Sequence, residues 1–414
     1  MRRLLLAGAA LAGLAVTAVV HAQGSTELFV ENARPATRST KAVTAEKRVR
    51  SAPTTGDMRV MGVRTPVLSG SDAVVTLNLP GASLSANGAI TSRSGDNYTW
   101  VGRVAGEPLS SVVLVVRSGK VTGEVRSKAG IFRVTPLEGD EHAVVKVNEA
   151  NLPADHDSEE APAPKQKSKR ATGKSGADAA GSEYAPPSKT YTVKVLVAYT
   201  AAAERAEPDI LAKIDEAEAS ANLSYERSDV RVRLKVAGVY KTTYEETGQS
   251  STDKEMTEVL ERRGRYGADV AVLVVSDLKN GSKSICGTSL RIAAPLSKAF
   301  TVVKASCLNL TMAHEIGHLI GVRHNWEKDQ NEGVCDGYGH GLYNIAGGWR
   351  TIMAYACDPP ASGACKRYPM WSNPRMKDEN GAPLGHVRYA DEARCLNTRI
   401  SIFCSGKAPC GRDQ

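Results

Sequence analysis

The sequence predicts an α/β (α+β) domain with a twisted, mostly parallel sheet over residues 189–414, preceded by a small β-rich unit within residues 23–150. Three observations support this division. Short alternating segments fill residues 58–147, an entirely apolar run occurs at residues 270–275, and a stretch poor in large aliphatic side chains lies between them at residues 151–188. A chain of 414 residues, 42% hydrophobic and 24% charged, is long enough for two or three globular domains.

Residues 1–22 have the pattern of a secretory signal peptide. Arg2 and Arg3 precede an apolar run from Leu4 to Val20, and the segment ends in Val-His-Ala, a small-x-small cleavage pattern. A membrane anchor is the alternative reading, but the run is slightly short, lacks a stop-transfer flank and is followed by polar sequence. We therefore expect a secreted, extracellular protein with no stable membrane association once the signal is removed.

Residues 23–150 predict a β-rich unit that contains no cysteine and no recognisable catalytic cluster. Turn residues separate its clearest strands, which are Val74–Leu79, Tyr98–Val104, Ser111–Val116 and Gly130–Val134. Residues 151–188 are rich in Pro, Ala, Ser, Gly and charged residues and cannot bury enough apolar surface to fold. They predict an exposed linker that proteases cut easily.

Beyond the linker, strands and helices alternate. Val270–Val275 is apolar throughout, as a strand covered on both faces must be. Pro208 marks the start of a helix with an apolar face, and Thr252 and Glu255 have the spacing of a capping box. The chain after Val322 is loop-rich. The predicted elements are strands 190–200, 230–240, 270–275, 285–292 and 300–306, helices 208–226 and 252–263, and a last helix that ends near Ile320.

The charge distribution argues against a nucleic-acid partner, and the cysteine spacing argues against a cysteine-ligated zinc site. The net charge is +8, but from Ser188 onward 30 Lys and Arg face 27 Asp and Glu, so no nucleic-acid partner is expected for the final domain. All eight cysteines lie in the last third of the chain. An even number in an exported protein indicates disulfides, whose pairing the sequence does not fix. A cysteine-ligated zinc site needs tight C-x-x-C pairs, and none occurs.

The segment HEIGHLIGVRH, residues 314–324, has the spacing of a catalytic zinc site. His314 and His318 are four apart and share one helix face, and Gly321 can end the helix and turn His324 toward the same ion. Three histidines leave the fourth position of Zn²⁺ open for water, as in catalytic rather than structural sites. Glu315 can then take the proton of that water as it attacks a peptide carbonyl. An ordinary polar helix would not need Gly321 and His324 at these offsets.

The same segment resembles a known family. HEIGHLIGVRH matches H-E-x-x-H-x-x-G-x-x-H of the metzincin metalloendopeptidases, and TIMAY, residues 351–355, resembles their Met-turn with Met353 at its centre. The resemblance covers Thr190 to about Pro374 and implies a metzincin-like catalytic domain with a propeptide before it. TIMAY, RYPMWSNP at residues 367–374 and the cysteine-rich tail are similar to the bacterial peptidyl-Asp metalloendopeptidases, which implies cleavage on the N-terminal side of aspartate.

Such specificity requires a fixed cation, for which arginine suits a carboxylate best. Candidates after the Met-turn are Lys366, Arg367, Arg375 and Arg388, each of which can instead be a solvated surface charge. Tyr355 occupies the position where astacins and serralysins carry a tyrosine that ligates zinc or stabilises the oxyanion, although it can also be a packed turn residue. We interpret His340 and His386 as surface or structural residues, and Trp349 and Trp371 as core or pocket wall.

The resemblance also implies latency through the protein's own propeptide. A zinc-bound cysteine is excluded because residues 23–150 contain none, so an Asp, a Glu or His142 remains as a blocking ligand, or the β-rich unit covers the cleft. Self-cleavage before aspartate predicts a mature N-terminus near Asp178. The expected partners are protein or peptide substrates, and we expect a monomer. Two alternatives stay open: a metzincin of broad or toxin-like specificity, and a non-catalytic extracellular binding protein on the same fold. The sequence gives no indication about calcium.

Overall fold

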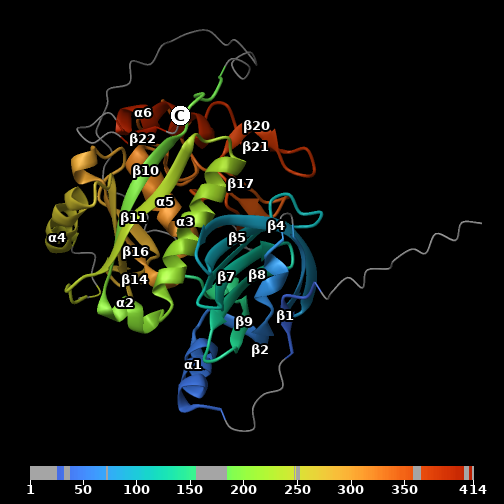
Figure 1. The fold of residues 1–414 in the computed structure, drawn as a ribbon. Helices are drawn as coiled ribbons and strands as arrows, with labels where there is room; N and C mark the ends of the chain where they lie inside the picture. The colour runs from blue at the N-terminus through green and yellow to red at the C-terminus, as the bar shows by residue number, and fades with distance from the viewer. Residues whose placement is uncertain are drawn as a thin grey trace, which may run out of the picture.

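A computed structural model describes residues 26–31, 38–70, 73–154, 184–246, 248, 252–357, 365–404 and 410–412. These residues form two units, the N-terminal unit (residues 26–154) and the C-terminal unit (residues 184–412), which lie side by side with helix α3 between them (Figure 1). The predicted signal peptide and most of the predicted linker, with Asp178, are outside the described residues. Among the helices that are described, none is long and apolar enough to cross a membrane.

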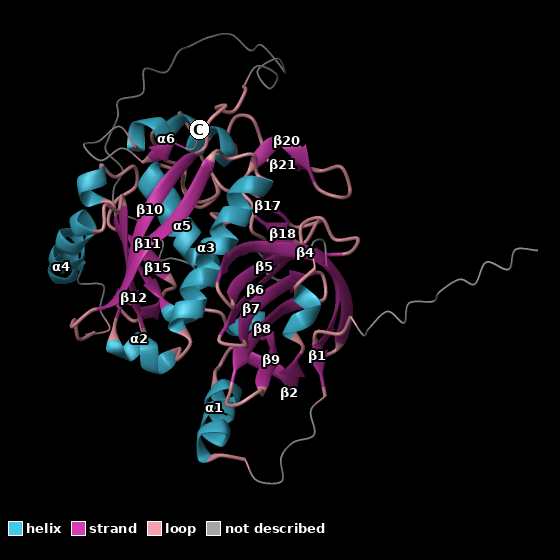
Figure 2. Cartoon of the chain, viewed as in Figure 1, coloured by secondary structure: helices cyan, strands magenta, loops and turns pink. Residues whose placement is uncertain are grey.

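The N-terminal unit is an antiparallel barrel (Figure 2). Its nine strands follow the order β1-β2-β9-β8-β7-β6-β5-β4-β3. The first and last strands of this order meet, because Leu28 N–H donates to Thr76 O at 2.9 Å and Glu27 bridges Thr76. The strands are β1 (Phe29–Val30), β2 (Thr55–Val63), β3 (Ala73–Leu79), β4 (Ala82–Ser94), β5 (Asn97–Val104), β6 (Ser111–Arg117), β7 (Lys120–Ser127), β8 (Gly130–Pro136) and β9 (His142–Val147).

Alternating side chains from these strands fill the barrel. Trp100, Leu114 and Phe132 are completely buried within it, which explains the period-two pattern of the sequence. The four predicted strands are present, and five further strands complete the sheet. Helix α1 (Thr40–Ser51) was not predicted; Ser39 caps its start by accepting from Ala42 N–H, and Ala42 is its only buried residue.

The C-terminal unit is built on a mostly parallel sheet of order β11-β10-β12-β16-β15, with β22 added beside β10. Strands β11, β10, β12 and β16 are parallel, and β15 at the edge is antiparallel to β16. β12 is buried at every position, as its apolar sequence predicted. The strands are β10 (Tyr191–Tyr199), β11 (Val232–Lys241), β12 (Val270–Val275), β15 (Gly287–Ser289), β16 (Phe300–Lys304) and β22 (Gly411–Arg412).

Helices α3 and α5 pack together on one face of this sheet, and the core between them contains Ile214, Ala217, Ala313 and Ile316. Helix α3 also packs against β6 of the N-terminal unit, so it contacts both units. The prediction of an α/β (α+β) domain behind a β-rich unit is confirmed. The helices are α2 (Ala201–Ala206), α3 (Ile210–Arg227), α4 (Thr252–Arg265), α5 (Leu308–Ile320) and α6 (Glu392–Phe403); the side chains of the proposed capping box lie outside the described part.

The chain after α5 is held by short ribbons and disulfides, in agreement with its loop-rich sequence. The ribbons after α5 are β17 (Tyr343–Asn344) with β18 (Trp349–Arg350) and β19 (Lys366–Arg367), and β20 (Asn373–Lys377) with β21 (Pro383–Leu384); a further ribbon, β13 (Lys279–Asn280) with β14 (Lys283–Ser284), lies before α5. All eight cysteines are paired, as Cys286–Cys307, Cys335–Cys395, Cys357–Cys365 and Cys404–Cys410. The second of these bridges ties the loop after His324 to α6.

Candidate metal centre and active site

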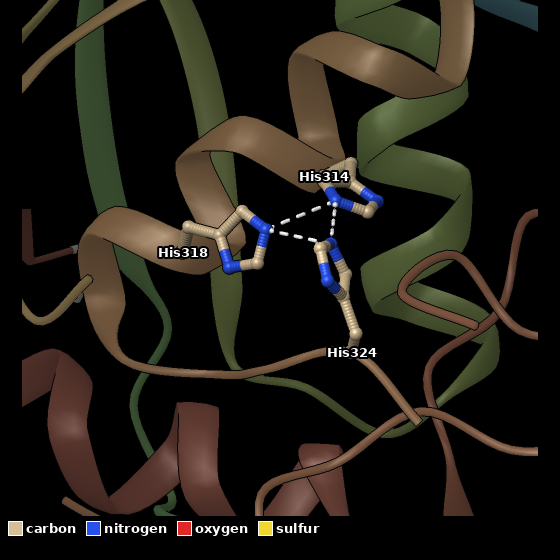
Figure 3. A group of neighbouring side chains, drawn as sticks. All are labelled: His314, His318 and His324. Atoms are coloured by element: carbon tan, nitrogen blue, oxygen red, sulfur yellow. Dashed lines mark hydrogen bonds between the residues drawn. The ribbon is translucent and has the colours of Figure 1, made fainter. Parts of the chain in front are cut away.

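Helix α5 and the turn that follows it position three histidines. The helix is buried at nearly every position and ends at Gly321, whose φ of 139° no residue with a Cβ adopts easily. Gly321 N–H and Val322 N–H both donate to Gly317 O, at 2.9 and 3.1 Å, so the chain reverses within two residues. His324 is thereby brought back opposite His314 and His318, as the spacing predicted (Figure 3).

The three Nε2 atoms form a nearly equilateral triangle. The distances are 3.1 Å between His314 and His318, 3.2 Å between His314 and His324, and 3.2 Å between His318 and His324. An ion at about 2.0–2.1 Å from each nitrogen would make N–Zn–N angles of roughly 100°, close to the tetrahedral value. All three side chains are buried, and three ring nitrogens this close together are suited to share one cation. The donor set fits zinc with one coordination position left open.

The opposite ring nitrogens fix the orientation of two of these histidines. His314 Nδ1 lies 2.9 Å from Ile352 O, and His318 Nδ1 lies 3.0 Å from Val322 O. A proton on each Nδ1 satisfies these carbonyls and leaves Nε2 as the metal ligand. His324 is held through its backbone, because buried His340 donates from Nδ1 to His324 O at 2.6 Å. His340 is therefore structural and not on the surface.

Glu315 is completely buried beside the first histidine. Ser289 on the edge strand β15 donates its hydroxyl to Glu315 Oε2 at 2.6 Å, and the same hydroxyl lies 2.8 Å from Glu315 O. A Cβ at Gly287 would lie 2.4 Å from Glu315 Oε1, so only glycine leaves room for the carboxylate there. The sequence indicated neither Ser289 nor Gly287, because both lie more than twenty residues before the motif in a strand too short to show a period.

The segment resembling a Met-turn passes beneath the histidines. Met353 is completely buried in the core cluster that also contains Ile316 and Ile352. The ring of Tyr355 packs edge-on against His324 with centroids 4.5 Å apart, and its N–H donates to Asn325 Oδ1 at 3.0 Å. Tyr355 therefore lies at the metal centre. Asn325, which holds it, was not singled out in the sequence.

Comparison with known proteins agrees with this geometry. The family described as "Metallo-peptidase family M12" matches residues 189–367. A "Peptidyl-Asp metalloendopeptidase" of Xanthomonas campestris pv. campestris is 31% identical over 89% of this chain and 90% of its own length. This chain belongs to metallopeptidase family M12. A protein of the same description from Stenotrophomonas maltophilia is 35% identical over 72% of this chain and 70% of its own.

The metallopeptidase also has remote likeness to solved structures. Metalloproteinase-II from Bacteroides fragilis matches with a TM-score of 0.41 and 10% identity, over 63% of this chain and 83% of that one. The family assignment comes from the sequence relatives, and with the histidine triangle it establishes a zinc metalloendopeptidase. The resemblance to metzincins and to peptidyl-Asp metalloendopeptidases is confirmed.

Arg367 is the predicted pocket residue that lies at the metal centre of the metallopeptidase. Its side chain is buried, its Nε donates to Ile352 O at 2.9 Å, and its Nη2 lies 2.9 Å from His314 Nδ1. Since Nδ1 carries a proton when Nε2 binds metal, Arg367 and His314 both donate to Ile352 O. The guanidinium is thus held by the carbonyl of the residue that precedes Met353.

The other pocket candidates point elsewhere. Arg375 forms a two-pronged ion pair with Asp391 at 2.6 and 2.7 Å, and Lys366 Nζ donates to Lys128 O in the N-terminal unit. Arg388 is exposed.

Two aromatic predictions and one latency candidate also have clear positions. Trp349 and Trp371 are buried core residues, whose ring N–H groups donate to Asp378 and Ser224, respectively. His142 is buried in the barrel, where Nε2 accepts from Val121 N–H at 3.0 Å and Nδ1 lies 3.1 Å from Asp140 O. Because both ring nitrogens are engaged inside the N-terminal unit, His142 is not placed to block the metal. The partly exposed His386 stacks on Tyr389.

Proposed function

We propose that this metallopeptidase is a secreted zinc endopeptidase that cleaves peptide bonds on the N-terminal side of aspartate and is made as a zymogen. The observation that carries the specificity is the buried Arg367, whose guanidinium is fixed beside the metal-binding helix. The curated relatives are described as peptidyl-Asp metalloendopeptidases, which supports the same preference.

The positions of the side chains support the following catalytic roles. His314, His318 and His324 would hold one zinc ion, which when bound lowers the pKa of a water molecule and polarises the substrate carbonyl. Glu315, oriented by Ser289, takes the proton of the attacking water and passes it to the leaving amine. Tyr355, packed on His324, would donate to the oxyanion as it develops.

Arg367 would select the residue after the scissile bond. A guanidinium binds a carboxylate through two parallel hydrogen bonds, and burial strengthens this pairing because little water competes with it. The bond from Nε to Ile352 O holds the guanidinium plane and so its direction.

A peptide digest tests this specificity. Mature enzyme should cut a denatured proteome before aspartate, and a zinc chelator should abolish the cutting. Arg367→Gln should lower kcat/KM for Asp peptides at least a hundredfold relative to Asn peptides, while Arg388→Gln, an exposed arginine from the same region, should leave this ratio unchanged. Chelator-sensitive cleavage with no aspartate preference would favour broad or toxin-like specificity. No cleavage by wild type would favour the non-catalytic binding protein.

We also propose that the N-terminal unit is the propeptide and acts as an inhibitor. It contacts the segment that carries the specificity residue, because Arg126 Nη1 donates to Arg367 O at 2.8 Å. Maturation then requires a cut in the linker, and self-cleavage near Asp178 is the route we expect. N-terminal sequencing of secreted wild type and of Glu315→Ala tests this: the same mature terminus in both would rule out self-processing.

A further inference from the structure

Strands β5, β6 and β7 of the N-terminal unit pack against helix α3 of the C-terminal unit. The polar centre of this contact is formed by β7, which also reaches the first turn of α5. Three polar contacts surround the centre. Arg117 pairs with Asp215 at 2.6 Å, Thr122 donates to Asp209, and Arg126 donates to the carbonyl of Arg367.

At the centre, two buried glutamates share one amide. Asn309, in the first turn of α5, donates from Nδ2 to Glu124 Oε1 at 3.2 Å and to Glu216 Oε1 at 2.8 Å. Glu124 belongs to β7 of the N-terminal unit and is 3% exposed, and Glu216 belongs to α3 of the C-terminal unit and is 2% exposed. The two carboxyl oxygens are therefore neighbours across the contact, away from water.

The cations around this pair stabilise the charged form of Glu124 more than that of Glu216. Arg126 Nε lies 2.6 Å from Glu124 Oε1, and Arg133 Nε on β8 lies 3.1 Å from Glu124 Oε2. Lys213 on α3 acts on both glutamates only through space. Although burial opposes ionisation, the two arginines keep the pKa of Glu124 below its ordinary value. Glu216 has no arginine of its own and faces the charged Glu124.

We propose that Glu216 is a proton-operated latch for the propeptide: the N-terminal unit docks on α3 and α5 when Glu216 carries a proton, and its hold weakens as Glu216 ionises beside Glu124. A protonated Glu216 places a neutral carboxyl against the Glu124 carboxylate. Loss of that proton puts two like charges on one asparagine amide, and Lys213, Arg126 and Arg133, which act on Glu216 only through space, do not outweigh its burial. Undocking relieves the repulsion by returning both groups to water.

The direction of the pH effect follows from linkage. Burial raises the pKa of Glu216 to about 7 from its ordinary 4.5, and the neighbouring Glu124 adds to the rise. The docked state therefore binds more protons than the undocked state between these values, so docking is strongest below about pH 4.5 and weakens as the pH rises to 7. Since one pKa unit is a factor of ten, the docking equilibrium should fall at least tenfold between pH 5 and pH 8.

Hydrogen exchange on the full chain measures docking directly. Glu315→Ala serves as the parent, because it prevents self-cleavage in the proposed mechanism. Peptides covering β7 and the first turns of α3 and α5 are followed from pH 5 to pH 8, with exchange times corrected for the intrinsic rate. We expect interface opening to increase at least tenfold in the parent. In Glu315→Ala/Glu216→Gln, which stays neutral at position 216, opening should stay at the level of pH 5.

The matched control is Glu218→Gln in the same parent. Glu218 lies on the same helix, but its carboxylate accepts from Val236 N–H within the C-terminal unit, so its loss should leave the pH dependence intact. Two results would overturn the proposal. One is interface protection in the parent that is constant from pH 5 to pH 8, and the other is a Glu216→Gln variant whose interface opening depends on pH as strongly as that of the parent. The inference rests on the proposed role of the N-terminal unit as propeptide, but the readout is docking. If the uncut chain were fully active, the proposed inhibition would be refuted, but the docking measured by exchange would not.

Discussion

At the scale of single residues, the geometry of the site depends on partners that come from outside the motif. The three histidines and Glu315 were predictable because a helix of period 3.6 and one glycine turn fix their relative positions within eleven residues. Ser289 and Gly287 were not, since they approach Glu315 only after β15 pairs with β16 and α5 packs beside it. Arg367 was one of four cationic candidates, and only the path of the chain after Met353 distinguishes it from the others.

Removal of the Ser289 hydroxyl should slow catalysis without loss of metal. Ser289→Ala leaves Glu315 without the hydrogen bond that orients it, and we expect kcat to fall about tenfold, within the range for partners of this kind. Glu315→Gln should lower kcat by about 10²–10⁴, because the general base itself is lost. Zinc content by atomic absorption should stay at the wild-type level in both. A Ser289→Ala enzyme with wild-type kcat would show that the hydroxyl has no part in orienting Glu315.

At the scale of elements, the main strands and helices of the C-terminal unit up to α5 were predicted closely, whereas α1, five barrel strands and α6 were not. Predicted strand 270–275 and the helix ending at Ile320 match β12 and α5, because apolar pattern and a glycine stop define them locally. Helix α6 was absent from the prediction. It contains Cys395, and is fixed by the Cys335–Cys395 bridge and by Asp391, whose side chain caps it by accepting from Arg394 N–H. Such tertiary contacts leave no period in the sequence.

Glu392, at the start of α6, should make the C-terminal unit less stable at alkaline pH. It is completely buried and accepts from Ser372 N–H at 2.7 Å, and burial raises its pKa to about 8. A raised carboxyl pKa contributes stability that is fully present below about pH 4.5 and lost as the pH rises toward 8. Glu392→Gln should therefore match wild type at pH 4.5 and be more stable at pH 9, by on the order of 2–4 kcal/mol. Calorimetry at both pH values checks this; equal melting temperatures at pH 9 would contradict it.

At the scale of the whole molecule, the two units are stabilised by different means. The N-terminal unit is a closed barrel with a continuous apolar core, whereas all the disulfides lie in the C-terminal unit. The sequence predicted this contrast, because cysteines are confined to the last third of the chain. It did not predict how the units dock, since the polar side chains that meet at β7, α3 and α5 come from segments that lie far apart in the sequence.

Loss of the Cys335–Cys395 bridge should destabilise the C-terminal unit alone. The bridge spans 60 residues. Closing a loop of that length lowers the entropy of the unfolded chain and so contributes about 4 kcal/mol to the free energy of unfolding. The double variant Cys335→Ala/Cys395→Ala should show faster hydrogen exchange in α5 and α6 and a lower melting temperature, with β5 and β6 as the internal control. Unaltered exchange in α6 would show that the bridge adds nothing to its stability.

The way the barrel closes limits how far the chain can be shortened. Residues 26–30 occupy the gap between β2 and β3, through hydrogen bonds of Leu28 with Thr76 and of Arg64 N–H with Leu28 O. A version of this protein produced without them would present two unpaired sheet edges, and such edges attract strands from other molecules. Purification tags and secretion leaders are therefore best joined ahead of residue 26, where they leave this seam intact.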